Sequence, residues 1–129
     1  MDSPAAARVL DPLASPIRLD IYRRLSRSAP GGMVAGDIAS AMDLPPSNVS
    51  FHLKDLAYAG LVTVEQEGRF QRYRANIPLM LDLVAYLTEE CCAGDPEQCL
   101  AYRKGSRVKE GVLPAPAPFR PAPAAPSRR

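Results

Sequence analysis

The sequence has little of several features that define common classes of protein. It has no tryptophan, one histidine and three cysteines among 129 residues. No apolar run approaches the roughly 18 residues that span a membrane, and the N-terminus lacks the basic start and apolar core of a signal peptide. We therefore expect a cytoplasmic protein with no membrane partner. A Gly-rich phosphate loop and a nucleophile paired with a base are also missing, which argues against an enzyme.

Charge is distributed unevenly along the chain. Residues 1–100 carry nine Lys or Arg against thirteen Asp or Glu, whereas residues 101–129 carry seven against one. The net charge of +2 gives no strong nucleic-acid signal, so DNA contact requires local patches. Six prolines and few bulky apolar residues between 113 and 129 predict a disordered segment. We expect one domain over 1–100 and a disordered basic Pro/Ala-rich tail over 101–129, which either contacts phosphates or only aids solubility.

Local signals predict a series of helices followed by one hairpin. After a weak helical stretch at about 5–12, "SPIRLDIYRRLSRS" has Ser15 as a cap and Pro16 at the first helical position. A short helix marked by Val34 ends at "DLPP", and "PSNVSFHLKDLAYAG" follows with an inner apolar stripe. "LVTVEQEGRFQRYRA" alternates around Gly68, as a β-hairpin does, and "IPLMLDLVAYLTEECC" is the last helix. The predicted fold is mainly α with a small β-hairpin (α+β).

The two short helices and the hairpin that follows them have the order of a winged helix–turn–helix. In that fold the second helix enters the major groove, and its first residues meet base edges. The hairpin "GRFQRYR" has three arginines and no acid, which suits the neighbouring DNA backbone. The candidate DNA-binding residues are Ser47, Asn48, Ser50, His52, Lys54, Arg69, Gln71, Arg72 and Arg74.

Each of these assignments has an ordinary structural alternative. Ser47 and Asn48 are equally suited to capping their helix. The three arginines could form a solvated hairpin face, and His52 is more often a packed, hydrogen-bonded residue than a base reader. A winged helix that binds protein rather than DNA is a further alternative, although the arginines and the polar helix start favour DNA.

Three stretches resemble the ArsR family of winged-helix repressors: "LASPIRLDIYRRL", "GDIASAMDLPPSNVSFHLKDLAYAGLV" and "EGRFQRYRA". The pattern S-x-H-L-x-x-L-x-x-A-G-L-V from Ser50 to Val62 is the most specific part, and the likeness covers about residues 10–92. The resemblance implies a homodimeric repressor that binds double-stranded operator DNA and is released by a metal or metalloid ion. The apolar face of the last helix, with residues 5–13, is then the candidate dimer seam, unless that face packs within its own domain.

The cysteines depart from the family's best-known site. The founding arsenic sensors bind through a "CVC" stretch, where this chain has Val34, Ala35 and Gly36, and the zinc sites of related members use histidines that this chain lacks on its last helix. All three thiols, Cys91, Cys92 and Cys99, instead fall within nine residues, as in a subset of arsenic-responsive members.

Three soft thiolates suit a soft ion. Three sulfurs complete the coordination shell of trivalent arsenic, supplied as arsenite, or of antimony, whereas structural zinc normally takes four ligands. The alternatives are zinc or cadmium completed by acidic side chains or a partner subunit, a redox switch between Cys99 and one of the pair, and inert structural cysteines.

Overall fold

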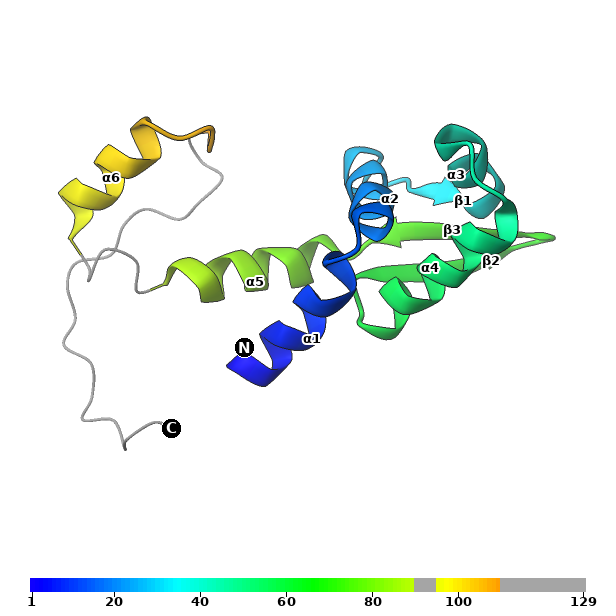
Figure 1. Ribbon diagram of the computed structural model, residues 1–129, viewed down its shortest axis with the longest axis horizontal. Coiled ribbons are helices and arrows are strands. Elements are labelled where there is room, and N and C mark those ends of the chain that lie inside the picture. Colours follow the sequence, from blue (N-terminus) through cyan, green and yellow to red (C-terminus); the bar gives the residue numbers. More distant parts are fainter. Residues whose placement is uncertain (90–94, 110–129) are drawn as a thin grey trace. The chain divides into compact units, whose positions relative to one another are not determined.

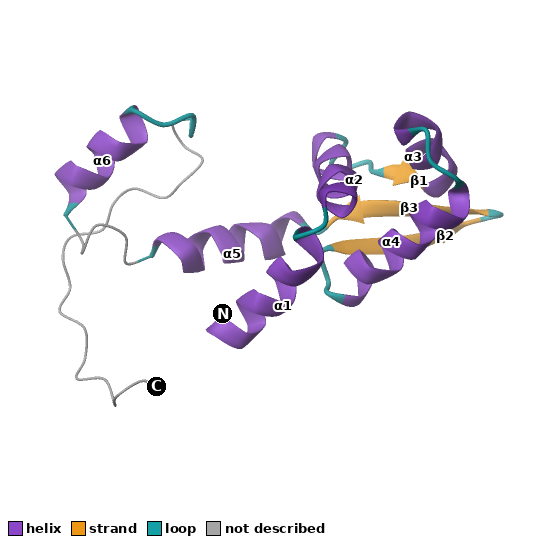
Figure 2. Ribbon diagram, in the orientation of Figure 1, coloured by secondary structure: helices purple, strands orange, loops and turns teal. Residues whose placement is uncertain are grey.

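The structure is a computed structural model that describes residues 1–89 and 95–109 (Figures 1 and 2). The chain divides into two compact units, Met1–Leu83 and the residues from Val84 onward. In chain order the elements are α1 (Ser3–Leu13), α2 (Pro16–Arg27), β1 (Met33–Val34), α3 (Ala35–Met42), α4 (Pro46–Tyr58), β2 (Val62–Glu67), β3 (Phe70–Ala75), α5 (Ile77–Thr88) and α6 (Pro96–Lys104). The predicted mainly α fold with a small hairpin is confirmed.

Short-range signals determine where the central helices begin and end. The hydroxyl of Ser15 accepts a hydrogen bond from the backbone N–H of Arg18 at 3.3 Å, so α2 has the cap that the sequence predicts. Asp43 closes α3 in the left-handed conformation, with φ of 53°. Pro45 and Pro46 then start α4, because proline lacks an N–H that the first turn does not need.

A three-stranded antiparallel sheet in the order β1-β3-β2 backs these helices. The β2–β3 hairpin turns at Gly68, where φ is 61°, and its tip projects past the helices in Figure 2. The strand β1 was not expected, because Val34 was assigned to the following helix. Met33 and Val34 instead pair with Tyr73 and Arg72 of β3.

Apolar side chains from three helices fill the centre of the core of the first unit. Ile21 and Leu25 of α2, Ile38 of α3, and Leu53 and Leu56 of α4 are fully buried. Each such residue contributes roughly 1.5–3 kcal/mol of transfer free energy. This packing fixes which face of α4 turns inward and which turns to solvent.

The C-terminal elements differ from the sequence prediction. α5 ends at Thr88, although the apolar pattern had been extended to Cys92. α6 was not predicted, and it crosses the expected domain boundary at residue 100. Its N-cap is Asp95, whose carboxylate accepts from the backbone N–H groups of Glu97 and Gln98 at 3.1 and 3.2 Å. From residue 110 onward, the predicted disordered tail lies outside the described residues.

Among the described residues, none of the helices has the length and apolar character that a membrane span requires.

Candidate nucleic-acid interface

α4 has an inner and an outer face, set by three buried side chains. Val49, Leu53 and Leu56 have at most 1% of their surface exposed. The predicted reading residues Ser47, Asn48, Ser50 and Lys54 are all exposed, and their side chains make no hydrogen bond or ion pair within the part of the chain that the structure describes. Ser47 and Asn48 do not cap the helix, because Pro45 occupies the N-cap position. Their polar groups are therefore available to a partner.

Sequence reasoning missed two large residues on this outer face. Phe51 is 64% exposed and Tyr58 is 97% exposed. With Ser47 and Lys54 they recur at four-, three- and four-residue spacing, which places them in one line along a helix. We call Ser47, Phe51, Lys54 and Tyr58 the outer stripe. The same helical spacing that identified the inner stripe would have identified this one.

His52 lies on the flank of α4 and contacts α2. Its Nδ1 is 3.4 Å from Nη1 of Arg18. A guanidinium only donates hydrogen bonds, so a hydrogen bond between these two nitrogens requires Nδ1 of His52 to accept. The same arginine nitrogen lies 3.2 Å from the carboxylate of Asp55. These contacts match the packed, hydrogen-bonded alternative for His52.

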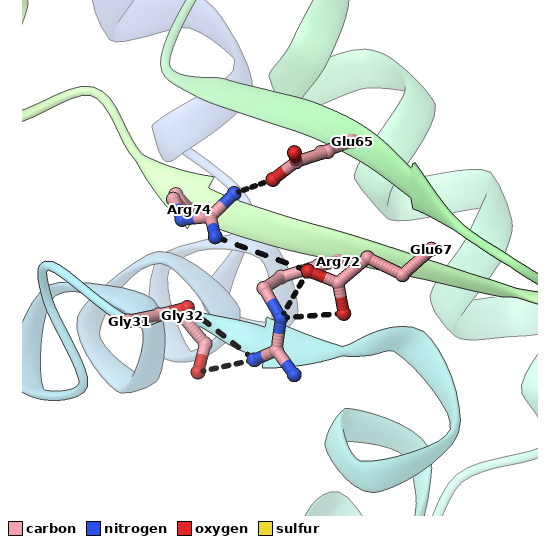
Figure 3. A network of polar contacts seen from close by, with 6 residues as sticks. All are labelled: Gly31, Gly32, Glu65, Glu67, Arg72 and Arg74. Atoms are coloured by element: carbon pink, nitrogen blue, oxygen red, sulfur yellow. Dashed lines mark hydrogen bonds and ion pairs between the residues drawn. The ribbon is translucent and has the colours of Figure 1, made fainter.

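Two of the three hairpin arginines are engaged by acids on the neighbouring strand (Figure 3). Arg72 donates through Nε to the carboxylate of Glu67 at 2.9 and 3.0 Å, and Nη1 of Arg74 lies 2.6 Å from that of Glu65. Arg72 also donates to the carbonyl oxygens of Gly31 and Gly32 at 3.3 and 3.4 Å. These two arginines therefore hold the hairpin together and tether it to the turn before β1.

Register explains these ion pairs, and the sequence contained the signal. Glu65 lies opposite Arg72, so the acids and the arginines share one face of the hairpin. Counting charge only from Gly68 onward left out both acids. The whole hairpin carries three arginines and two glutamates, a net charge of +1.

The arginine at the hairpin tip is not engaged by an acid among the described residues. Arg69 follows Gly68, is exposed and has no ion pair among the described residues. Gln71 is exposed too, and its amide oxygen accepts from the hydroxyl of Tyr73 at 3.2 Å. Burial raises the pKa of Tyr73 above its ordinary value, which further favours the neutral phenol that donates this hydrogen bond.

The thiol cluster is only partly within the described residues. Cys99 lies in the first half of α6, is 7% exposed and forms no disulfide. Cys91 and Cys92 fall outside the described residues. Within residues 1–89 and 95–109, no three potential ligand side chains gather into a metal-binding group.

Comparison with known proteins identifies relatives of this chain. A family model described as a helix-turn-helix domain matches residues 13–65. The chain is 36% identical over 90 residues to the transcriptional repressor SmtB of Mycobacterium tuberculosis, a match that spans 67% of this chain and only 64% of that protein's length. It is 35% identical over 107 residues to the transcriptional regulator CmtR of Mycobacterium bovis, covering 82% of this chain and 88% of that relative.

Solved structures similar to this chain are also described as regulators of transcription. A protein described as a possible transcriptional regulator for arsenical resistance is 28% identical, with a TM-score of 0.55 over 72% of this chain and 92% of that one. The homodimeric winged helix-turn-helix DNA-binding domain of a possible ArsR-family regulator from Mycobacterium bovis is 29% identical, with a TM-score of 0.54 over 69% of this chain and 82% of that one. The relatives are regulators of transcription and not enzymes. From its sequence, its fold and these likenesses, the chain belongs to the ArsR family of winged helix–turn–helix transcriptional regulators.

Proposed function

We propose that the protein is a homodimeric repressor that binds double-stranded operator DNA and leaves it when Cys91, Cys92 and Cys99 bind trivalent arsenic or antimony. As a DNA-bound regulator it acts in the cytoplasm. The observation that carries the effector assignment is the confinement of every thiol to nine residues beyond α5. The likeness to a possible regulator for arsenical resistance supports it.

The reading surface comprises the outer face of α4 and the hairpin tip. Ser47, Asn48 and Ser50 are compact hydrogen-bonding groups near the start of α4, where a recognition helix meets base edges. Lys54 and Arg69 are exposed cations without ion-pair partners among the described residues, and both suit phosphates. Arg72 and Arg74 are less available, because Glu65 and Glu67 already engage them.

Exposed apolar side chains support the proposed homodimer. Leu10 of α1 is 43% exposed and Leu81 of α5 is 53% exposed, whereas Leu83 packs within its own unit at 3%. α5 therefore uses one side for its own core and leaves apolar surface on another. A homodimer through α1 and α5 would cover that surface and set two α4 helices against two operator half-sites.

In the sequence, the thiols follow the elements that carry the proposed reading surface. α5 ends at Thr88 and α6 begins at Pro96, so the Cys91–Cys92 pair and Cys99 belong to separate parts of the chain. Joining all three sulfurs to one soft ion would constrain the segment between the two helices. Because binding couplings are reciprocal, operator DNA must weaken ion binding by the same factor by which the ion weakens DNA binding.

Operator titrations of the full-length dimer test the proposal. We expect arsenite to lower DNA affinity about 5–150-fold, the usual range of allosteric coupling. Single Cys→Ser replacements at 91, 92 and 99 should leave DNA binding intact and blunt the response, with Ser106→Ala as a matched control. X-ray absorption should show three sulfur neighbours around the bound arsenic.

The same titrations separate the alternatives. Release by zinc or cadmium but not by arsenite would reassign the effector. Release by an oxidant, reversed by a thiol reductant, would identify a redox switch through Cys99 and one of the pair. Equal DNA affinity with and without every effector would exclude allosteric release.

A further inference from the structure

Phe51 lies at the centre of the surface that α4 turns outward. Successive residues of a helix are rotated by about 100°, so Phe51 points almost opposite to the mean direction of Val49, Leu53 and Leu56. Those three are buried, whereas Phe51 is 64% exposed. The phenyl ring therefore stands on the far side of the helix from the core.

The residues around Phe51 are suited to DNA and not to a hydrophobic partner. Ser47 lies one turn before it, Lys54 lies almost one turn after it, and Ser50 precedes it; all three are exposed. Phe51 has one ring neighbour among the described residues, the edge of His52 at a centroid distance of 5.8 Å. The other exposed aromatic residue of this face, Tyr58, lies two turns away beyond Lys54, so the two rings do not form the contiguous apolar patch typical of protein–protein contact.

The major groove offers such a side chain one apolar group, the 5-methyl of thymine. Phenylalanine is one of the residues that contact this methyl, whereas serine and asparagine read hydrogen-bonding edges. Phe51 is the sixth residue of α4 and lies about 6 Å along the helix axis from Ser47, within the half that meets bases.

We propose that Phe51 is a specificity-determining residue that reads thymine in each operator half-site by packing against its 5-methyl group. This inference rests on the proposed DNA-binding function and adds the base that this position of α4 selects. The neighbouring serines and Asn48 then fix hydrogen-bonded base positions, while Phe51 selects a methyl that they do not recognise.

Replacement of thymine by uracil tests the proposal, because it removes the methyl and leaves every hydrogen-bonding edge unchanged. Duplexes are first selected from a random library by the full-length protein at one fixed salt concentration. Each thymine of the selected site is then replaced in turn by deoxyuridine, and the dissociation constant is measured. We expect a loss of about fourfold per methyl at one position of each half-site, which corresponds to about 0.8 kcal/mol.

Variants assign that loss to Phe51. Phe51→Ala should bind the thymine and uracil duplexes equally, and Phe51→Leu should keep part of the discrimination. Leu19→Ala, an exposed apolar change on α2, should discriminate as the wild type does. Because Phe51 is exposed, thermal melts should show all three variants folded.

The outcomes separate the two levels of the proposal. If the wild-type protein binds its selected duplex but tolerates uracil everywhere, or if Phe51→Ala keeps the discrimination, the reading of thymine by Phe51 is wrong while DNA binding stands. If no duplex is selected at all, the proposed function fails together with this inference.

Discussion

Nη1 of Arg18 on α2 lies 3.4 Å from Nδ1 of His52 on α4. The same guanidinium binds the carboxylate of Asp55 at 3.2 Å, and its Nε donates to the carbonyl oxygen of Pro12 at 2.8 Å. One side chain thus joins α1, α2 and α4. In the proposed dimer, where α1 is part of the seam, Arg18 would link that seam to α4.

Arg18→Ala should destabilise the protein and weaken DNA binding. The variant loses three hydrogen bonds at a partly exposed site, so we expect the free energy of unfolding to fall by about 1–2 kcal/mol. Urea denaturation measures that change, and operator titration measures the accompanying loss of affinity. Arg23→Ala, an exposed change on the same helix, should alter stability by no more than about 0.5 kcal/mol. Equal behaviour of the two variants would contradict a role for Arg18 in holding α4.

Replacing Glu65 and Glu67 together by Gln should strengthen DNA binding. The change frees Arg72 and Arg74 from their ion pairs and removes two charges that repel phosphate. The slope of log K against log salt should steepen by about 1–2, because each new phosphate contact contributes about 0.9. Titrations at four or more salt concentrations give the slope.

Arg69→Gln should weaken DNA binding, because it removes a positive charge from the same hairpin. Arg69 has no ion pair within the described residues, so its loss should reduce the salt slope by about 1 and leave stability unchanged. A slope that moves for neither hairpin variant would show that the wing does not touch the DNA backbone.

Gly32→Ala should disrupt the joint between β1 and the hairpin. Gly32 has φ of +74°, and an added Cβ would lie 2.2 Å from the carbonyl oxygen of Tyr73. The backbone must shift, so we expect a loss of several kcal/mol, measured by thermal or urea unfolding. Gly36→Ala is the matched control. It has open space in α3 and should be neutral or stabilising by up to about 1 kcal/mol.

Asp95→Ala should expose the thiol of Cys99. The carboxylate caps α6, and loss of an N-cap costs about 1 kcal/mol, which is about fivefold in a local opening equilibrium. In a background with Cys91 and Cys92 replaced by Ser, alkylation of Cys99 should be slow and should quicken about fivefold in the variant. Leu100→Ala, an exposed change in the same helix, should alkylate at the parent rate; an equal increase there would argue against the cap.

The limits of sequence reasoning are clearest at the C-terminal helices. α5 was extended to Cys92 because its apolar pattern continues, yet the described helix ends at Thr88. α6 was missed because it has a single buried residue, Cys99, and so lacks an apolar stripe. Its start signal is Asp95 as the N-cap, followed by Pro96 at the first helical position.

By itself the sequence determined the order of the helices and the hairpin as far as α5, but not β1, and it determined the inner face of α4. Those features depend on local periodicity and on proline and glycine, which act within a few residues of chain. Three features depended on the tertiary structure alone. Two residues before α3 form a strand, and Arg18 contacts His52, which lies 34 positions away in the sequence. Arg72 and Arg74 form ion pairs within the hairpin. Such pairings arise only when packing brings distant segments together. The hydrophobic periodicity of one segment therefore does not show which segment will pack against it.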